Sequence, residues 1–413
     1  MVVQHNMQAV NANRMLNVTT SAQSKSTEKL SSGYRINRAA DDAAGLTISE
    51  KMRKQIKGLD RASTNAEDGV SAVQTAEGAL TEVHSMLQRM NELATQSANG
   101  TNSNTDRKAI QDEIDQLTTE IDRVSETTKF NETYLLKGDG AEKAHNVNAH
   151  DAGLDGVTLT DKGDTVDVTL KTLNAGDKVS IAGKNYTIGA TAADAQKIVD
   201  AQKVDGKTVT VNGTTYTYKT NQWTNADGSA ATVGGGAAGS ITIKGGDVVS
   251  DGTKTLTAMK DGADAAGADG IDDNDSTVIT AGKAYQLQTA EIVKASSIGT
   301  DTAAAVKNGA NADKDATATF TLNKGTVSYK DALSFNLHVG ADADMTNKIT
   351  VNIDSMNSAG LGVKGIKADT EQDATYAIDA IADAISTVSS QRSSLGAVQN
   401  RLEHTINNLD NVV

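Results

Sequence analysis

The stretch from residue 80 to residue 94 reads LTEVHSMLQRMNELA and repeats an apolar side chain every three or four positions, at Leu80, Val83, Leu87, Met90 and Leu93. That spacing is typical of one face of an α-helix. The same stripe extends back towards the N-terminus through Val73, Val70, Ala66, Leu59, Ile56, Met52 and Leu46. It predicts a long amphipathic helix that buries one face against other helices.

Two further stripes have the same spacing. Residues 97–104 are a turn cluster of Ser, Ala, Asn, Gly and Thr, and Asp106 or Thr105 is expected to cap the helix that follows. Its apolar positions are Ile110, Ile114, Leu117, Ile121 and Val124. The far end of the chain repeats the pattern at Ile378, Ile381, Ile385, Val388, Leu395, Val398, Leu402, Ile406 and Leu409. Helices from opposite ends of the chain would therefore bury their stripes in one bundle of coiled-coil type.

Composition favours uninterrupted helices and excludes several classes of protein. None of the 413 residues is proline or cysteine. Proline breaks helix interiors, and without cysteine there is no disulfide, thiolate metal site or cysteine nucleophile. A net charge of -14 argues against nucleic-acid binding, which needs a basic surface. No stretch reaches the ~20 apolar residues that span a bilayer, and residues 1–14 lack the pattern of a Sec signal, so no membrane insertion is expected.

The middle of the chain has a different composition. No arginine lies between Arg123 and Arg392, and Asp is the only acid between Glu142 and Glu291. Asp, Gly and Thr favour turns and strands over helix interiors. Tight hairpins are predicted at 179–186 and at 209–216, with a short helix at 192–201 between them. Because both chain ends join one bundle, the middle must leave it and return, as an inserted domain does.

The predicted fold class is α+β: a long helical coiled-coil or bundle rod built from both chain ends, with a rod hairpin and an inserted β-rich outer domain. The hairpin follows from two alternating runs, Phe335, Leu337, Val339 and Ile349, Val351, Ile353. The predicted domains are 1–45, an N-terminal assembly helix, 46–138 plus 334–413, the rod, and 139–333, the outer domain. The first segment carries only a thin apolar stripe, so we expect it to be disordered in the monomer and to fold on a partner.

Residues 30–53 read LSSGYRINRAADDAAGLTISEKMR and resemble the signature of bacterial flagellins. The resemblance continues through 87–94, 120–124, 130–131 and 392–401, and it covers roughly residues 1–138 and 334–413. It implies an extracellular, self-assembling structural subunit of the bacterial flagellar filament, with no enzymatic activity and no cofactor. A zinc-peptidase insert, which some flagellins carry, is not expected because the sequence has no His-Glu-x-x-His motif.

The resemblance also implies partners. These are other flagellin subunits in a homopolymer, the flagellar type III export apparatus, and the filament cap and hook-associated proteins. Flagellins similar to this chain usually continue beyond the position of Val413, in a helix that pairs with the N-terminal segment and is used by the export chaperone. The resemblance therefore predicts that the sequence is a fragment, or else a natural variant, whose assembly depends on that helix.

A vertebrate Toll-like receptor reads members of this family, which implies a receptor site on the first rod helices. By motif match, the receptor-binding residues are Leu87, Gln88, Arg89, Leu93, Ile110 and Glu113. A guanidinium beside an exposed leucine and a carboxylate suits a small binding hot spot. From the residues alone, Leu93 would instead belong to the bundle core and Arg89 to a solvated face. Leu117 stands where strongly recognised relatives are expected to have Arg, which predicts a lower affinity.

Other motifs are expected to be structural. Residues 234–239 fit G-x-G-x-x-G but precede a strand-like segment, so a loop is predicted. The acidic run 269–275 lacks EF-hand spacing and is predicted to be a solvated loop. His145 and His150 lie five apart in an expected loop without a carboxylate cluster, so no metal site is predicted. The aromatic residues Tyr216, Tyr218 and Trp223 could stack on a glycan, but we favour a small core for them.

Overall fold

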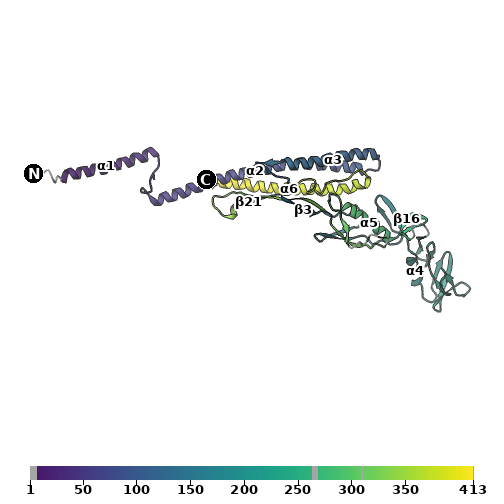
Figure 1. Ribbon diagram of the computed structural model, residues 1–413. Coiled ribbons are helices and arrows are strands. Elements are labelled where there is room, and N and C mark those ends of the chain that lie inside the picture. Colours follow the sequence, from purple (N-terminus) through teal and green to yellow (C-terminus); the bar gives the residue numbers. More distant parts are fainter. Residues whose placement is uncertain (1–6, 263–267, 308–310, 312, 314, 413) are drawn as a thin grey trace. The chain divides into compact units, whose positions relative to one another are not determined.

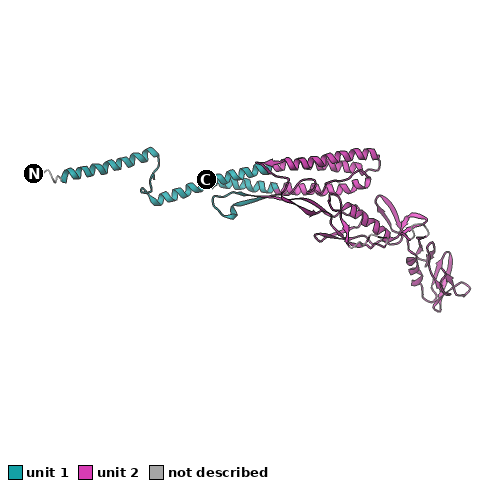
Figure 2. Cartoon of the chain, viewed as in Figure 1, with its two compact units in different colours: residues 1–74, 335–351, 395–413 teal, residues 75–334, 352–394 magenta. Residues whose placement is uncertain are grey.

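The computed structural model describes residues 7–262, 268–307, 311, 313 and 315–412. They form two compact units, drawn in different colours in Figure 2. The first unit comprises residues 1–74, 335–351 and 395–413, and the second comprises residues 75–334 and 352–394. Each unit draws on segments far apart in the sequence, because both chain ends contribute helix to each of them.

The long helices run as the apolar stripes predict. Helix α1 is Met7–Ser32, α2 is Ala43–Ser97, α3 is Asn104–Thr127 and α6 is Glu371–Val412 (Figure 1). In the second unit, the stripes of α2, α3 and α6 are fully buried at Leu87, Met90, Ile114, Ile121 and Val388. Each of these side chains contributes about 1.5–3 kcal/mol on burial, so this core stabilises the helices far more than their intrinsic propensity does.

The predicted rod hairpin is also present. Strand β20 is Leu333–His338 and β21 is Lys348–Ile353, with the short helix η2, Met345–Asn347, just before β21. In the first unit the hairpin packs on α2 and α6 through a cluster that contains Ala66, Val339, Ile349 and Leu402. A Cβ on Gly69 would lie 2.2 Å from Leu337 Cδ1, so the absence of a side chain there allows the close approach.

The cap of α3 differs from the prediction. Ser103 is the N-cap residue, and Asp106 is the third residue of the helix. Ser103 Oγ accepts a hydrogen bond from the Asp106 backbone N–H at 3.2 Å, and the Asp106 carboxylate accepts one from the Ser103 N–H at 3.1 Å. This reciprocal capping box satisfies two donors that a helix start leaves free. The bonds from Ser103 lower the pKa of Asp106, its side-chain bond most strongly.

Two antiparallel strand pairs lie where the chain passes from the helices into the insert. Strand β1, Lys129–Phe130, pairs with β2, Thr133–Tyr134. Strand β3, Asp139–Asn146, pairs with β19, Thr326–Asp331, so the outgoing and returning chain lie side by side. This places His145 on a strand, not in the expected loop, and its ring stacks on Tyr329 with centroids 4.0 Å apart.

The first lobe of the insert is built on two four-stranded sheets. One has the order β17 (Ala305–Val306), β18 (Thr319–Asn323), β5 (Thr165–Thr169), β4 (Thr158–Asp161). The other has the order β15 (Ile271–Asp272), β16 (Asp275–Ile279), β7 (Lys184–Ile188), β6 (Lys178–Ile181). Within the acidic run 269–275, residues 271–272 and 275 belong to strands β15 and β16, so the prediction of a loop is wrong there, whereas 269–270 and the turn at 273–274 lie outside strands.

Helix α5, Ala281–Ala295, completes the first lobe and was not predicted. Thr280 caps it by accepting a hydrogen bond from the Lys283 N–H, and Ile292 carries its apolar face into the lobe's core. The polar residues Gln288 and Thr289 are buried on the same helix. They interrupt the apolar stripe, which is why the periodicity did not reveal the helix.

The second lobe holds a five-stranded sheet of order β10 (Gln222–Thr224), β9 (Thr214–Lys219), β8 (Thr208–Val211), β13 (Val248–Ser250), β14 (Thr255–Thr257). Helix α4, Ala192–Ala201, packs against it, and β11 (Thr232–Val233) pairs in parallel with β12 (Ser240–Ile241). The short helix and both predicted hairpins are confirmed. The turn at Asn212 and Gly213 has positive φ at both residues, which Asn and Gly tolerate best. Residues 234–239 form the predicted loop between β11 and β12.

Candidate functional site

Arg89 and Glu113 form an ion pair between α2 and α3 in the second unit. Arg89 Nε lies 2.9 Å from Glu113 Oε1, and Arg89 Nη1 lies 3.2 Å from Glu92 Oε2. The Arg89 and Glu113 side chains expose 49% and 45% of their surface, so both can meet a partner. Hydrogen bonds to Glu113 first, and then to Glu92, raise the pKa of Arg89 above its already high usual value. The pair holds a rigid, planar donor group in place on the bundle surface.

The other predicted receptor residues are divided between surface and core. Gln88 is exposed and its Nε2 lies 3.1 Å from His84 Nε2. Leu87, Leu93 and Ile110 are buried, with exposures of 0%, 2% and 7%. The expectation that Leu93 is an exposed leucine is therefore wrong in this chain: it follows Met90 by three residues on the stripe that faces the other helices, as the residues alone suggested.

The end of this helix pair is tied together by Arg107, which sequence reasoning missed. Its Nε donates to Ser97 O at 2.9 Å, Nη1 to Asn102 O at 3.0 Å and Nη2 to Asn99 O at 3.1 Å. Only 9% of the side chain is exposed. A buried guanidinium thus bonds to carbonyl groups at the C-terminus of α2 and in the following turn, where the Asn99 carbonyl also accepts from the Asn102 N–H. The sequence pattern did not single out Arg107, because one arginine in the first turn of a helix that follows a polar turn resembles a solvated charge.

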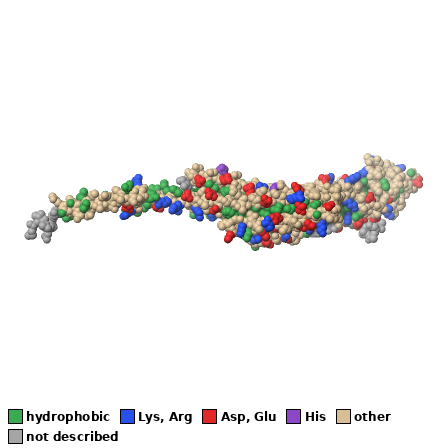
Figure 3. All heavy atoms as spheres, turned by 90° about the horizontal axis from the view of Figure 1, so that it is seen from above, with side chains coloured by type: hydrophobic (Ala, Val, Ile, Leu, Met, Phe, Trp, Pro, Cys, Tyr) green, Lys and Arg blue, Asp and Glu red, His purple; other side chains and the backbone are tan. Residues whose placement is uncertain are grey.

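A second surface consists of apolar side chains that nothing covers in the described part of the first unit. Helix α1 has no buried residue, and it exposes Met7, Val10, Met15, Leu16 and Val18 by 57–78%. At the start of α2, Ile48, Met52 and Ile56 follow one another at single-turn spacing and expose 57%, 58% and 41%. Figure 3 shows apolar side chains at the surface of the N-terminal helix, next to the grey residues. Leu16, nine residues after Met7, points to the opposite side of α1, and we call the other seven residues the apolar helix face.

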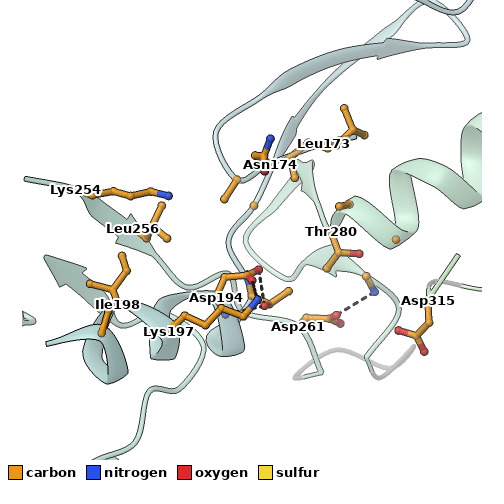
Figure 4. A pocket seen from close by; sticks show the side chains of 18 of the residues that line it. Leu173, Asn174, Asp194, Lys197, Ile198, Lys254, Leu256, Asp261, Thr280 and Asp315 are labelled. Carbon is orange, nitrogen blue, oxygen red and sulfur yellow. Dashed lines mark hydrogen bonds and ion pairs between the residues drawn. The ribbon is translucent and has the colours of Figure 1, made fainter. Parts of the chain in front are cut away.

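A cavity of about 690 Å³ lies in the insert, between residues of its two lobes. Figure 4 shows its polar groups bonded to neighbours: Asp194 accepts from Thr191 and Lys197, and Asp261 accepts from the Gly270 N–H at 3.0 Å. No group of three or more potential His, Cys, Asp or Glu metal ligands occurs among the described residues. The cavity lies where the two lobes of the insert meet, and this junction accounts for it.

The aromatic residues of the second lobe fill its core. Trp223 is 1% exposed and Tyr218 is 9% exposed, and their rings meet edge to face with centroids 5.1 Å apart. Tyr216 packs against the same cluster and is partly buried. The rings of Trp223 and Tyr218 are therefore not free to stack on a glycan. Among the residues that the structure describes, no helix is both long and apolar enough to cross a membrane.

The helices from both chain ends, the hosted insert and the uncovered helix face together are typical of a structural protein. Comparison with known proteins gives the family. The family model for the bacterial flagellin N-terminal helical region matches residues 3–141, and that for the C-terminal helical region matches residues 378–413. The chain belongs to the bacterial flagellin family, and it is an extracellular structural component of the flagellar filament, not an enzyme.

Individual relatives match along nearly the whole chain. A flagellin of Clostridium tyrobutyricum is 39% identical over 415 residues, which is 99% of this chain and 87% of the relative. Flagellin B of Vibrio anguillarum is 31% identical over 99% of this chain and 85% of its own length. Among solved structures, FliC from Burkholderia pseudomallei is 17% identical with a TM-score of 0.31, over 81% of this chain and 99% of that one. A TM-score that low adds nothing to the assignment.

Proposed function

We propose that this chain assembles with further copies of itself through the apolar helix face. The observation that carries the proposal is α1, a helix of 26 residues without one buried side chain. An isolated helix of that kind is marginal in water, so a partner surface has to stabilise it. In a filament subunit that surface is another copy of the chain. The same argument applies to Ile48, Met52 and Ile56, which expose three large side chains in a row.

A double substitution, Ile48→Gln with Ile56→Gln, tests this proposal. About half of each side chain is still exposed, and full burial of an isoleucine contributes about 1.5–3 kcal/mol, so the pair should weaken each subunit contact by about 2–3 kcal/mol. Sedimentation and negative-stain microscopy under polymerising conditions measure the loss of filaments. Lys51→Gln on the same helix is the control, and it should leave assembly unchanged. Normal filaments from the double variant would contradict the proposal.

Recognition by a vertebrate Toll-like receptor is a second candidate function. The exposed ion pair of Arg89 and Glu113 favours it, because arginine is enriched in hot spots and this one is already positioned. In this proposal, Arg89, Glu113 and Gln88 contact the receptor. The buried residues Leu87, Leu93 and Ile110 hold the two helices at the required spacing.

The receptor proposal is tested by measuring the affinity of the receptor ectodomain for single variants. Arg89→Ala and Glu113→Ala should each lower the affinity by about tenfold or more, the size expected for a hot-spot residue. Arg123→Ala is a matched control, because Arg123 is an exposed arginine on α3 that pairs with Glu120. Equal effects of Arg89→Ala and Arg123→Ala would mean that charge alone matters, and the proposed site would be wrong.

The proposed filament role extends to the other partners that the family resemblance implies. These are the flagellar type III export apparatus, the filament cap and the hook-associated proteins. We also propose the division into residues 1–45, the rod of 46–138 with 334–413, and the outer domain of 139–333. Limited proteolysis tests this division: cleavage should concentrate in the loops of the insert, 139–333, while the rod segments 46–138 and 334–413 resist, and equal cleavage of rod and insert would contradict it.

A further inference from the structure

Methionine is the sulfur-containing residue of this cysteine-free chain, and thioethers are readily oxidised to sulfoxides. The described methionines differ widely in exposure. Met90 and Met356 are fully buried and Met259 is 6% exposed. In contrast, Met7, Met15, Met52 and Met345 expose 78%, 62%, 58% and 72%. Met86 is intermediate in exposure, so an oxidant in solution reaches the four exposed thioethers first and the three buried ones last.

Within the described ranges, three of the four exposed methionines lie on the apolar helix face. At 3.6 residues per turn, Met7 and Met15 fall on the same side of α1 as Val10 and Val18. Met52 lies one turn from both Ile48 and Ile56 on α2, and these three residues line one shallow groove together with Gly45. Met345 is elsewhere, in the short helix η2 before β21.

We propose that Met7, Met15 and Met52 make assembly sensitive to oxidation, with a hydroperoxide as the oxidant. The inference rests on the proposed assembly function. The thioether sulfur attacks one peroxide oxygen, an S–O bond forms and the O–O bond breaks. With hydrogen peroxide, the second oxygen leaves as water after a proton transfer, so methionine loses two electrons and the peroxide gains them.

The physical consequence follows from the polarity of the product. A sulfoxide replaces an apolar, flexible group with a polar oxygen that accepts hydrogen bonds. Packed against the apolar side chains of a second copy, this oxygen would lose its bonds to water without gaining a partner. The monomer pays no such cost, because its three thioethers already face solvent. Oxidation therefore disfavours the assembled state alone, and reduction of the sulfoxide restores the face.

The test compares the full chain before and after limited treatment with hydrogen peroxide. Peptide mass spectrometry should find sulfoxide at Met7, Met15, Met52 and Met345 long before Met90 and Met356. Sedimentation and microscopy should then show that the oxidised chain forms few filaments. A variant with Met7→Leu, Met15→Leu and Met52→Leu keeps apolar side chains of similar volume. It should assemble both before and after treatment, although Met345 is still oxidised in it.

Several results would overturn the proposal. If the oxidised chain assembles as well as the untreated chain, the proposed sensitivity to oxidation is refuted and the assembly proposal is unaffected. Loss of assembly in the oxidised leucine variant places the effect at another residue, such as Met345, and also refutes it. Untreated chain that does not assemble at all removes both proposals. Simultaneous oxidation of Met90 and the surface methionines shows that the helices have opened, which contradicts the exposure on which the inference depends.

Discussion

Replacement of Arg107 should destabilise the end of the helix bundle in the second unit. Its guanidinium donates to three carbonyl oxygens, of Ser97, Asn99 and Asn102. Asn99 is exposed and Asn102 half-buried, so in Arg107→Ala their carbonyls can turn to water, whereas Ser97 is fully buried. One buried acceptor without a partner costs about 1–3 kcal/mol. Lost packing of the Arg107 stem adds about 1 kcal/mol, so the expected total is about 2–4 kcal/mol.

Urea unfolding followed by helical circular dichroism measures this loss as a lower midpoint with an unchanged slope. Hydrogen exchange of residues 97–104 should show where the structure opens first. Arg107→Lys keeps the charge but cannot donate to three carbonyls in fixed directions, so it should fall between Ala and the unaltered chain. Lys108→Ala, at the exposed neighbouring position, is the control. A cost below about 0.5 kcal/mol for Arg107→Ala, the size of an ordinary surface change, would refute the reasoning.

Three other predictions follow from local geometry. Gly69→Ala places a Cβ 2.2 Å from Leu337 Cδ1 and should destabilise the first unit by about 1–3 kcal/mol. Gly78→Ala lies on the same helix but in the second unit, where a Cβ meets open space, so it should stabilise that unit by about 0.5–1 kcal/mol; thermal unfolding of the two variants compares them. Trp223→Ala should cost the second lobe about 3–5 kcal/mol, measured by proteolytic susceptibility of residues 192–258. The pKa of Asp106 is lowered in the folded state, so its capping contribution to stability is complete above the unfolded-state pKa and is lost as pH falls through the folded-state pKa. The Asp106→Asn variant should therefore be less stable than the unaltered chain at neutral pH and should lose less stability on acidification. Equal pH profiles of the two proteins in urea unfolding would contradict this prediction.

Most helices and turns of this chain could be predicted because their signals are local. The stripe from Leu46 to Leu93 repeats at helical spacing, and the whole segment lies within α2. Helix α4 was predicted with its bounds, and the hairpin at 209–216 followed from an Asn-Gly pair whose positive φ a tight turn requires. The local signal failed where polar residues are buried, as in α5, and at the start of α3, where Asp106 or Thr105 was predicted as the cap and Ser103 is the N-cap residue.

The candidate site could be predicted only in part. The resemblance drew attention to Arg89 and Glu113, and the structure places their side chains 2.9 Å apart although they are 24 residues apart in the chain. The resemblance could not show which neighbouring leucines are exposed and able to contact a partner. Leu93 is almost fully buried because other helices cover its stripe, whereas Ile48 and Ile56, with the same local pattern, remain exposed.

The sequence by itself determined most of the secondary structure, the α+β class and the flagellin family, because these depend on neighbouring residues and on motifs that can be recognised in a line. The tertiary structure alone decided which apolar faces are covered and which polar groups are paired. The Gln111 side chain, for example, bonds to the backbone of Ile366 and Ala368, and Asp122 bonds to Ser358, 236 residues away. Such contacts join segments from opposite ends of the chain. Helical periodicity predicts that a helix has an apolar face, but it does not predict which segment packs against that face.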